Sequence, residues 1–397
     1  MTDFSRDIDG FRAKVPVTKE WAYLITASTG LVPDFVYEGA RRYMDARYLA
    51  GGDSVWEYPD AGVGTLEMME RSKRAIGTML GCAPERICFG QSATQMFTMV
   101  TEGIDYAPDA NVVTVGEGWI GNRFAWQKRE AEGLEVRYAA SRDGLITAEA
   151  LMELCDERTA AVTVNSVESD TGYRVDLDKL GTFCRERNIL LFVDAVQSAG
   201  ALVNDFDGSC IDFLVGNDYK WMMNFCGTGY ACVGERVMPL IHRWGAGWMS
   251  DAERFNTAKA RLELRSDAGR FEIGYPNAPG IYGLGLAAMQ YNLLGAERVE
   301  RYVRSLAEYC IERAVAMPGV RCTFDIPRER RSQIVLLSFD SSIAATDEDF
   351  KAAHVFAPSF SAPDENGERR ARLSFHYYND REDIDRFFAV IEASRKR

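Results

Sequence analysis

The sequence is poor in histidine and has no cysteines at disulfide or metal-ligand spacing. Its three histidines, His242, His354 and His376, lie far apart, so the pattern does not predict a zinc site. Its nine cysteines are scattered over 397 residues, are odd in number and include no CxxC pair. This usage is typical of reduced thiols in a cytosolic protein. We therefore expect neither a metal ion nor a disulfide framework.

The sequence also lacks a basic block and a long hydrophobic run. The formal net charge is −13, and no cluster of Lys and Arg alternates with aromatic residues. Such a chain repels a phosphate backbone, so we expect no nucleic-acid partner. Residues 1–17 carry acidic side chains and no apolar core segment, which predicts neither a signal peptide nor a membrane span. We expect a cytoplasmic protein that does not bind membranes.

Short apolar runs alternate with amphipathic ones between residues 85 and 235. This alternation indicates βα units and a mostly parallel sheet with helices on both faces. In such sheets, functional residues gather beyond the carboxyl ends of the strands. The expected strands are RICFG (86–90), NVVTV (111–115), LEVRYA (134–139), AAVTVNSV (160–167), ILLFVDAV (189–196), DFLVG (212–216) and GYACVG (229–234), with helices at 93–104, 122–133, 147–157 and 177–188.

The pattern changes after about residue 285. A long helical stretch, 281–317, is followed by three strand-like runs and a closing helix at 380–395. This order indicates a smaller α+β domain joined to the sheet domain through the long helix. We expect an N-terminal segment over 1–20, a large domain over 21–285 and a small C-terminal domain over 286–397.

Two residues near the ends of neighbouring strands suggest a cofactor site. Asp194 lies near the carboxyl end of ILLFVDAV, and a buried carboxylate is costly unless it is paired. Lys220 follows the next strand, between Tyr219 and Trp221. Pyridoxal phosphate requires a lysine amine for its Schiff base and a carboxylate against its pyridinium nitrogen. Aromatic neighbours lower the pKa of a lysine, which favours the nucleophilic amine. The same two residues are equally compatible with a buried ion pair that binds no cofactor.

A phosphate group would need a helix N-terminus, and RICFGQSATQMFTMV supplies one. Ser92, Ala93 and Thr94 open a helical run directly after a strand and Gly90. Free backbone N–H groups and the helix dipole attract a phosphate there, and the Thr94 hydroxyl adds a donor. A simple N-cap is the alternative. The coincidence with Asp194 and Lys220 favours the phosphate site.

The run VVTVGEGWIG (112–121) has the GxGxxG spacing of a dinucleotide-binding turn. That fingerprint requires an acidic residue at the end of the next strand, but LEVRYAAS has Ala and Ser there. The turn also contains Trp119, where small residues are expected. An indole at this edge of the sheet is well placed to stack on a flat ring. We therefore favour ring stacking over NAD binding.

In combination, these motifs resemble the class V aminotransferases of the fold type I pyridoxal phosphate enzymes. That group includes cysteine desulfurases, selenocysteine lyases, kynureninase, isopenicillin N epimerase and alanine–glyoxylate aminotransferases. The likeness runs from about residue 20 to the C-terminus. It implies an α/β fold: a large domain with a mostly parallel seven-stranded sheet sandwiched by helices, and a smaller C-terminal α+β domain. It also implies a homodimer with shared active sites and an amino acid substrate.

The resemblance assigns roles to the residues around the cofactor. VDAVQSAG is similar to the segment whose Asp pairs with the ring nitrogen and whose Gln contacts the ring hydroxyl, here Asp194 and Gln197. YKWMMNFCGTG resembles the stretch with the Schiff-base lysine, here Lys220. The resemblance further implies that Tyr219 touches the phosphate, and GQSAT resembles the phosphate turn, with the Ala93 amide and the Thr94 hydroxyl as donors.

Further motifs extend the site. Trp119 falls where relatives have a ring-stacking His or Trp, and VESDTG resembles a segment that brings Ser169 near the ring hydroxyl. RFEIGYPN resembles RFExGTPN, which in the family reaches the partner's phosphate; Tyr275 replaces the usual Thr, and Asn277 is retained. RLSFHYYND resembles the segment whose Arg binds the substrate carboxylate, here Arg372, although a surface arginine is the alternative.

One departure from the family bears on the reaction. Cysteine desulfurases carry a nucleophilic cysteine in the loop before the substrate-binding Arg, whereas HVFAPSFSAPDENGERRA (354–371) has none. The last cysteine is Cys322, in an expected strand. A desulfurase that forms a persulfide on its own cysteine is therefore disfavoured.

Trp119 and the ESDTG segment favour transamination as the reaction. The alternative is a β-eliminating carbon–sulfur lyase, and a kynureninase-like hydrolase or an epimerase comes after it. An NAD oxidoreductase and a cofactor-free binding protein are the hypotheses from other classes. The aromatic candidates for a substrate pocket, which are equally compatible with core packing, are Trp56, Tyr58, Trp244 and Trp248.

Overall fold

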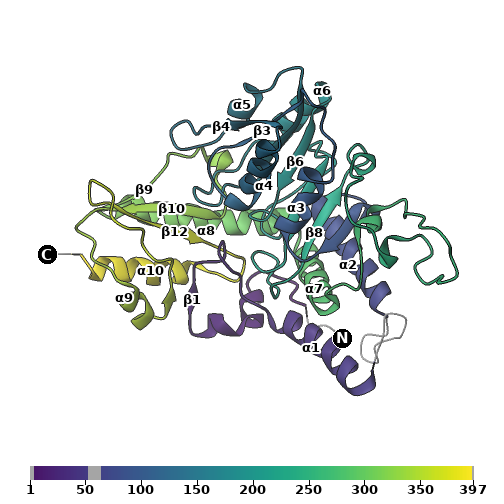
Figure 1. Ribbon diagram of the computed structural model, residues 1–397. Coiled ribbons are helices and arrows are strands. Elements are labelled where there is room, and N and C mark those ends of the chain that lie inside the picture. Colours follow the sequence, from purple (N-terminus) through teal and green to yellow (C-terminus); the bar gives the residue numbers. More distant parts are fainter. Residues whose placement is uncertain (1–3, 52–63, 396–397) are drawn as a thin grey trace.

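The computed structural model describes residues 4–51 and 64–395, and a seven-stranded sheet forms its centre (Figure 1). The strand order is β2-β8-β7-β6-β5-β3-β4. β8 runs antiparallel to both neighbours, and the other pairs are parallel. The expected mostly parallel sheet is therefore confirmed. Its strands are β2 (Ile87–Gly90), β3 (Asn111–Val115), β4 (Glu135–Ala139), β5 (Thr159–Asn165), β6 (Leu190–Asp194), β7 (Phe213–Asn217) and β8 (Gly229–Val233).

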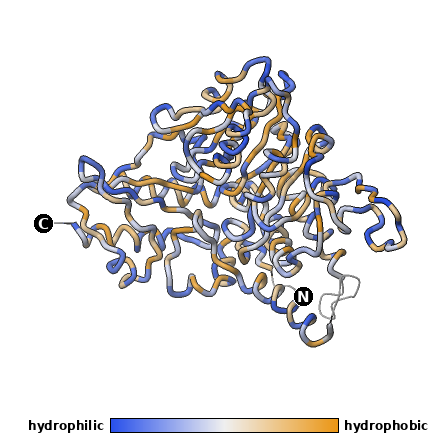
Figure 2. Tube along the Cα trace, viewed as in Figure 1, coloured by the Kyte–Doolittle hydropathy of each residue, from blue (hydrophilic) through white to orange (hydrophobic). Residues whose placement is uncertain are grey.

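Helices cover both faces of this sheet, because its strands are apolar on both sides. α3 (Ala93–Thr101) and α4 (Ile120–Ala131) share one hydrophobic cluster with one face of the sheet. The other face packs against α2 (Thr65–Leu80), α5 (Ala148–Met152), α6 (Leu177–Glu186) and α7 (Ala278–Leu294). α1 (Asp34–Ala50) adds Phe35 and Val36 to this second cluster. Figure 2 shows hydrophobic residues along the central strands and hydrophilic ones on the outer loops.

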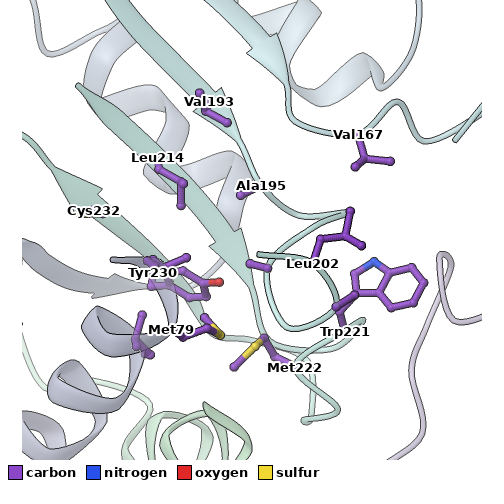
Figure 3. Close-up of a cluster of buried hydrophobic side chains, with 14 of the residues drawn as sticks. Met79, Val167, Val193, Ala195, Leu202, Leu214, Trp221, Met222, Tyr230 and Cys232 are labelled. Carbon is purple, nitrogen blue, oxygen red and sulfur yellow. The ribbon is translucent and has the colours of Figure 1, made fainter. Parts of the chain in front are cut away.

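Strand β6 shows how this packing aims one polar side chain. Leu190 and Phe192 contact the cluster under α3 and α4, whereas Leu191 and Val193 belong to the opposite cluster. Figure 3 shows Val193 and Ala195 among the core side chains on that opposite side. Because side chains alternate along a strand, Asp194 faces α3 and α4.

The C-terminal part builds its own small sheet, seen to one side of the large sheet in Figure 1. The antiparallel order is β12-β10-β9, and these strands pack with neighbouring helices around a separate hydrophobic cluster. β1 (Ala22–Tyr23) pairs with β11 and contributes to the same cluster. The domain boundaries at 21 and 286 stay a prediction. The elements are α8 (Ala296–Ala316), β9 (Val320–Cys322), β10 (Ile334–Phe339), α9 (Asp347–Ala352), β11 (Val355–Phe356), β12 (Arg369–Ser374) and α10 (Arg381–Ala393).

The expected long helix over 281–317 is wrong in one respect, because it is two helices. α7 and α8 meet at Gly295, which has φ +88°. Glycine adopts a positive φ without the steric cost that a side chain would bring. The N–H of Gly295 still bonds to the Tyr291 carbonyl at 3.0 Å, and α8 then starts in a new direction. The N-terminal half of α8 packs on the large cluster and its C-terminal half on the small one.

Over residues 4–51 and 64–395, no helix is long and apolar enough to cross a bilayer. In the same ranges, no three His, Cys, Asp or Glu side chains are grouped as metal ligands. All nine cysteines are free thiols.

Candidate active site

Asp194 lies at the carboxyl end of β6 and is buried. Its Oδ2 accepts a hydrogen bond from Asn122 Nδ2 at 2.6 Å, and its Oδ1 accepts one from the Val196 N–H at 2.8 Å. Burial raises the pKa of Asp194, whereas these two bonds and the charge of Lys220 lower it. A carboxylate held by two donors has free lone pairs on both oxygens. It can therefore accept a further hydrogen bond from a ligand.

Lys220 follows β7, at the same edge of the sheet, and is 7% exposed. Its Nζ lies 5.5 Å from the ring centre of Trp119 and 5.9 Å from that of Tyr219. Burial lowers the pKa of Lys220 to about 8; Asp194 acts in the opposite direction and Arg372 in the same one. An amine with this pKa is in part uncharged near neutral pH and can attack a carbonyl carbon.

Close backbone packing fixes the position of Lys220. The Gly30 N–H donates to the Tyr219 carbonyl at 2.8 Å. A Cβ on Gly30 would collide with the backbone oxygen of Lys220, so this approach requires glycine. The following residues, Trp221 and Met222, lie in the hydrophobic core (Figure 3). The backbone at Lys220 is therefore fixed by its neighbours.

The glycine-rich turn presents Trp119 beside the start of α3. A Cβ on Gly121 would lie 2.5 Å from Trp119 Nε1 and 3.2 Å from Thr94 Oγ1. The Trp119 indole and the Thr94 hydroxyl therefore both lie next to Gly121. Trp119 is 47% exposed, which leaves surface of the ring open for a ligand to stack on. The turn places an aromatic side chain near Lys220, and its stacking on a cofactor ring stays a prediction.

The N-terminus of α3 offers backbone donors next to this turn. Ser92 caps the helix by accepting from the Gln95 N–H at 3.1 Å. A Cβ on Gly229 would collide with the backbone of Ser92 and Ala93, so β8 approaches the helix start more closely than any other residue would allow. A helix N-terminus of this kind attracts an anion.

Arg372 and Ser169 contact each other, and the charge of Arg372 acts on Lys220. Arg372 Nη1 donates to the Ser169 carbonyl at 2.7 Å, and Nη2 donates to Ser28 Oγ at 2.9 Å. Asp170 is 3.8 Å from the same guanidinium. Burial lowers the pKa of Arg372, but a guanidinium stays charged at neutral pH. These contacts fix Arg372 from β12 against the loop after β5, so it is not a free surface arginine.

Gln197 lies behind the site, and its amide already has two protein partners. Its Nε2 donates to the Ala27 carbonyl at 3.1 Å, and its Oε1 accepts from Trp221 Nε1 at 2.9 Å. His376 Nε2 pairs with the Trp221 carbonyl at 2.9 Å, and burial lowers its pKa to about 3. His376 is therefore neutral at physiological pH and supports Trp221.

Tyr275 and Asn277 line a cavity of about 570 Å³. Gly90, at the end of β2, and Gln95, in the first turn of α3, line it as well. Asn277 caps α7, and its Nδ2 donates to Thr228 Oγ1 at 3.1 Å. Tyr275 is half exposed. A contact between either side chain and a phosphate in a partner subunit stays a prediction.

The aromatic candidates for the substrate pocket lie in different places. Trp244 lines the cavity with Tyr275, whereas Trp248 packs on Phe255 outside it. Trp56 and Tyr58 lie outside the described residues.

Sequence analysis missed a group of polar residues behind Asp194. Asn122 Nδ2 also donates to Asn165 Oδ1 at 3.2 Å, and Asn165 Nδ2 donates to the Glu168 carboxyl at 3.2 and 3.3 Å. Burial raises the pKa of Glu168 to about 8. The available signal was Asn165, a polar residue at the carboxyl end of the strand that pairs with β6.

The residues present fit pyridoxal phosphate. A buried carboxylate, an amine of lowered pKa, an open indole face and a helix N-terminus are the groups that its ring nitrogen, aldehyde, ring face and phosphate require. Gly121 and Gly229 keep side-chain atoms out of the corner between the indole and the helix start. The individual assignments to Ala93, Thr94, Trp119, Ser169 and Gln197 stay predictions.

Comparison with known proteins agrees with this chemistry. The family described as Aminotransferase class-V matches residues 22–387. A probable cysteine desulfurase from Pyrococcus abyssi is 24% identical, over 96% of each chain. The apo cysteine desulfurase of Thermococcus onnurineus NA1 superimposes with a TM-score of 0.83 at 20% identity, over 99% of each chain. A cystine C–S lyase, C-DES, in complex with its product cysteine persulfide, gives a TM-score of 0.81 at 18% identity, over 96% of this chain and 100% of that one.

The family match covers nearly the whole chain, and the solved structures share its fold. The chain therefore belongs to the class V aminotransferase family of pyridoxal-phosphate-dependent enzymes.

Proposed function

We propose that this enzyme cleaves the carbon–sulfur bond of a sulfur-containing amino acid by β-elimination, with cystine as the model substrate. One observation carries the proposal: relatives along the whole chain are named cysteine desulfurases, yet no cysteine follows Cys322 in this sequence. A desulfurase that transfers sulfur to its own thiol needs a cysteine near Arg372. An elimination does not, because the sulfur leaves on the substrate fragment.

The site residues divide the work between binding and proton transfer. Arg372 binds the substrate carboxylate through its charged guanidinium. Hydrogen bonds to Ser28 Oγ and to the Ser169 carbonyl fix the position of this group. Lys220 would hold the cofactor, and its amine, which is partly neutral because burial lowers its pKa to about 8, would take the Cα proton. Bound pyridoxal phosphate supplies an electron sink that acidifies this proton, and Asp194 keeps its ring nitrogen protonated.

The bond changes balance without an oxidant. The electron pair of the Cα–H bond forms the Cα–Cβ double bond, and the pair of the Cβ–S bond leaves with the sulfur. Hydrolysis of the released enamine gives pyruvate and ammonia. With cystine, the leaving group becomes cysteine persulfide, the product named for the structural neighbour C-DES.

Transamination, which the sequence favoured first, has less support than this alternative. Most of the relatives compared are named cysteine desulfurases, although one from Bacillus subtilis, 21% identical, is named an uncharacterized aminotransferase. Trp119 and ESDTG are compatible with both reactions. A substrate panel separates the two. The purified enzyme is incubated with cystine, cysteine, selenocysteine or alanine, with and without pyruvate or glyoxylate as acceptor. Pyruvate, ammonia and persulfide from cystine without an acceptor support elimination; a keto acid formed only with an acceptor contradicts it.

The active unit in this proposal is a homodimer. Ile273 and Tyr275, which line the cavity beside the start of α3, are 43% and 50% exposed, and Ile120 and Phe124 on α4 are exposed as well. Exposed apolar groups of this size commonly mark an interface. Light scattering on the purified enzyme tests this point, and a monomer of 44.5 kDa that is fully active contradicts it.

A further inference from the structure

Glu168 is a buried carboxyl to which the reaction above gives no role. It lies in the loop after β5 and is 5% exposed. Its own backbone is fixed, because its N–H donates to the Tyr173 carbonyl and its carbonyl accepts from the Gly172 N–H, both at 2.9 Å. The side chain is therefore aimed inward by a rigid turn.

A chain of amides connects Glu168 to Asp194. Asp194 accepts from Asn122, whose other N–H is shared with Asn165 Oδ1, and Asn165 in turn donates to Glu168. A carboxylate only accepts hydrogen bonds, so Asn122 must turn its nitrogen toward Asp194. Asn165 must then turn its oxygen toward Asn122 and its nitrogen toward Glu168. An acceptor at position 168 thus fixes the orientation of the whole chain.

The same carboxyl explains the glycine in the turn before Trp119. Gly118 has φ +89°, and a Cβ there would lie 2.5 Å from Glu168 Oε2. The Glu168 carboxyl therefore occupies the space next to Gly118, in the turn that carries Trp119. It is connected to two parts of the candidate cofactor site: to Asp194 through Asn165 and Asn122, and directly to the turn that carries Trp119.

The charges around Glu168 favour its neutral form. The charged groups that face it are carboxylates: Asp170 in its own loop, Asp194 on β6 and Glu117 in the turn before α4. Lys220 acts on Asp194, but in the part of the chain that the structure describes no cation is among the charges that act on Glu168. A second charge beside Asp194 would be repelled in this buried place.

We propose that Glu168, as a neutral carboxylic acid, is a positioning residue that holds Asn165, Asn122 and Asp194 in register with the pyridine ring of the cofactor. This inference rests on the proposed cofactor site but not on the proposed carbon–sulfur reaction. When Glu168 ionises at alkaline pH, its negative charge repels the Asp194 carboxylate, and the affinity for the cofactor falls.

The test measures cofactor affinity rather than turnover. The holoenzyme is resolved, and the dissociation constant of pyridoxal phosphate is determined from its absorbance for the wild type, E168Q, E168L and N122A. E168Q keeps an acceptor for Asn165, so we expect wild-type affinity at pH 7. E168L removes the acceptor and leaves a buried N–H unpaired, so we expect affinity to fall by about tenfold or more. The matched control is E130Q, which removes an exposed carboxylate on α4 that is not among the charges facing Glu168, and it should leave the affinity unchanged.

Two further measurements keep the test independent of how well E168L folds. Between pH 7 and 9.5, wild-type affinity should fall more steeply than that of E168Q, because Lys220 titrates in both proteins but position 168 titrates only in the wild type. In a double-mutant cycle, adding E168L to N122A should lower the cofactor affinity by less than about a further twofold. Both substitutions break the same hydrogen-bond chain, so their effects should not add.

Any one of three results would overturn the inference. These are identical pH profiles of cofactor affinity for the wild type and E168Q, independent effects of E168L and N122A in the cycle, and wild-type affinity in E168L. Normal cofactor binding without pyruvate from cystine would instead contradict only the proposed reaction.

Discussion

A buried neutral Glu168 should make the enzyme less stable as the pH rises, and Glu168→Gln should remove this loss. Burial raises the pKa of Glu168 from 4.5 to about 8. Between these values the folded protein binds one proton that the unfolded chain has released. Folding stability then decreases as the pH increases, because protons are held more tightly in the folded state. Glutamine has the same shape and no proton to lose.

The size of the effect follows from the width of that window. Each pH unit within it costs about 1.4 kcal/mol. From pH 4.5 to pH 7 the difference is 2.5 units, so Glu168 lowers the free energy of unfolding by roughly 3 kcal/mol at pH 7 relative to a group that does not titrate. The loss is largest near pH 8 and constant above it. E168Q should therefore be more stable than the wild type, and increasingly so from pH 5 to pH 8.

Urea midpoints of the two proteins at pH 5, 6, 7 and 8 measure this difference. A chain of this size need not unfold in one step, so the change of the gap with pH carries the result rather than its absolute value. The control is E130Q, which removes an exposed carboxylate that accepts from Tyr138 Oη and is not among the charges facing Glu168. Such surface changes usually stay within about 0.5 kcal/mol. A gap between wild type and E168Q that is flat or narrows with rising pH refutes the reasoning.

Four other expectations test the site. Lys220→Ala should fold normally but retain no cofactor mass after borohydride reduction; mass spectrometry of the reduced protein checks this, and a covalent adduct elsewhere contradicts it. Arg372→Ala should raise KM for the amino acid by about tenfold or more, since a charge-assisted pair is lost, while cofactor affinity stays unchanged; steady-state kinetics decide, and an unchanged KM removes Arg372 from the substrate site. Turnover should rise as the pH approaches about 8, because burial lowers the pKa of Lys220 to about that value and only the neutral amine accepts a proton; a pH–rate profile that falls from pH 6 to 8 argues against Lys220 as the base. Gly118→Ala should lower the melting temperature, because its Cβ meets Glu168 Oε2 at a positive φ, and pairing it with E168A should recover part of the loss.

Much of the fold was predictable because its signals are local. The strands of the large sheet are short apolar runs, and α3, α4 and α6 follow them with amphipathic spacing. The break at Gly295 was not predicted, because a single glycine inside a helical pattern does not reveal its φ angle. The pairing of β1 with β11 joins segments more than 300 residues apart, and two-residue strands leave no pattern.

From the sequence alone, Lys220 and Asp194 could be predicted to lie together, because the carboxyl ends of neighbouring parallel strands meet at one edge of a sheet. Their roles toward a cofactor stay predictions. The helix start at Ala93 was also predictable, because Ser92 is a local capping residue. Only the tertiary structure decided how Asp194 is held. Asn122 lies 72 positions away on α4, and the bond between them depends on how that helix packs on the sheet. The protonation of Glu168 likewise depends on burial among other carboxylates, which is a property of the folded protein.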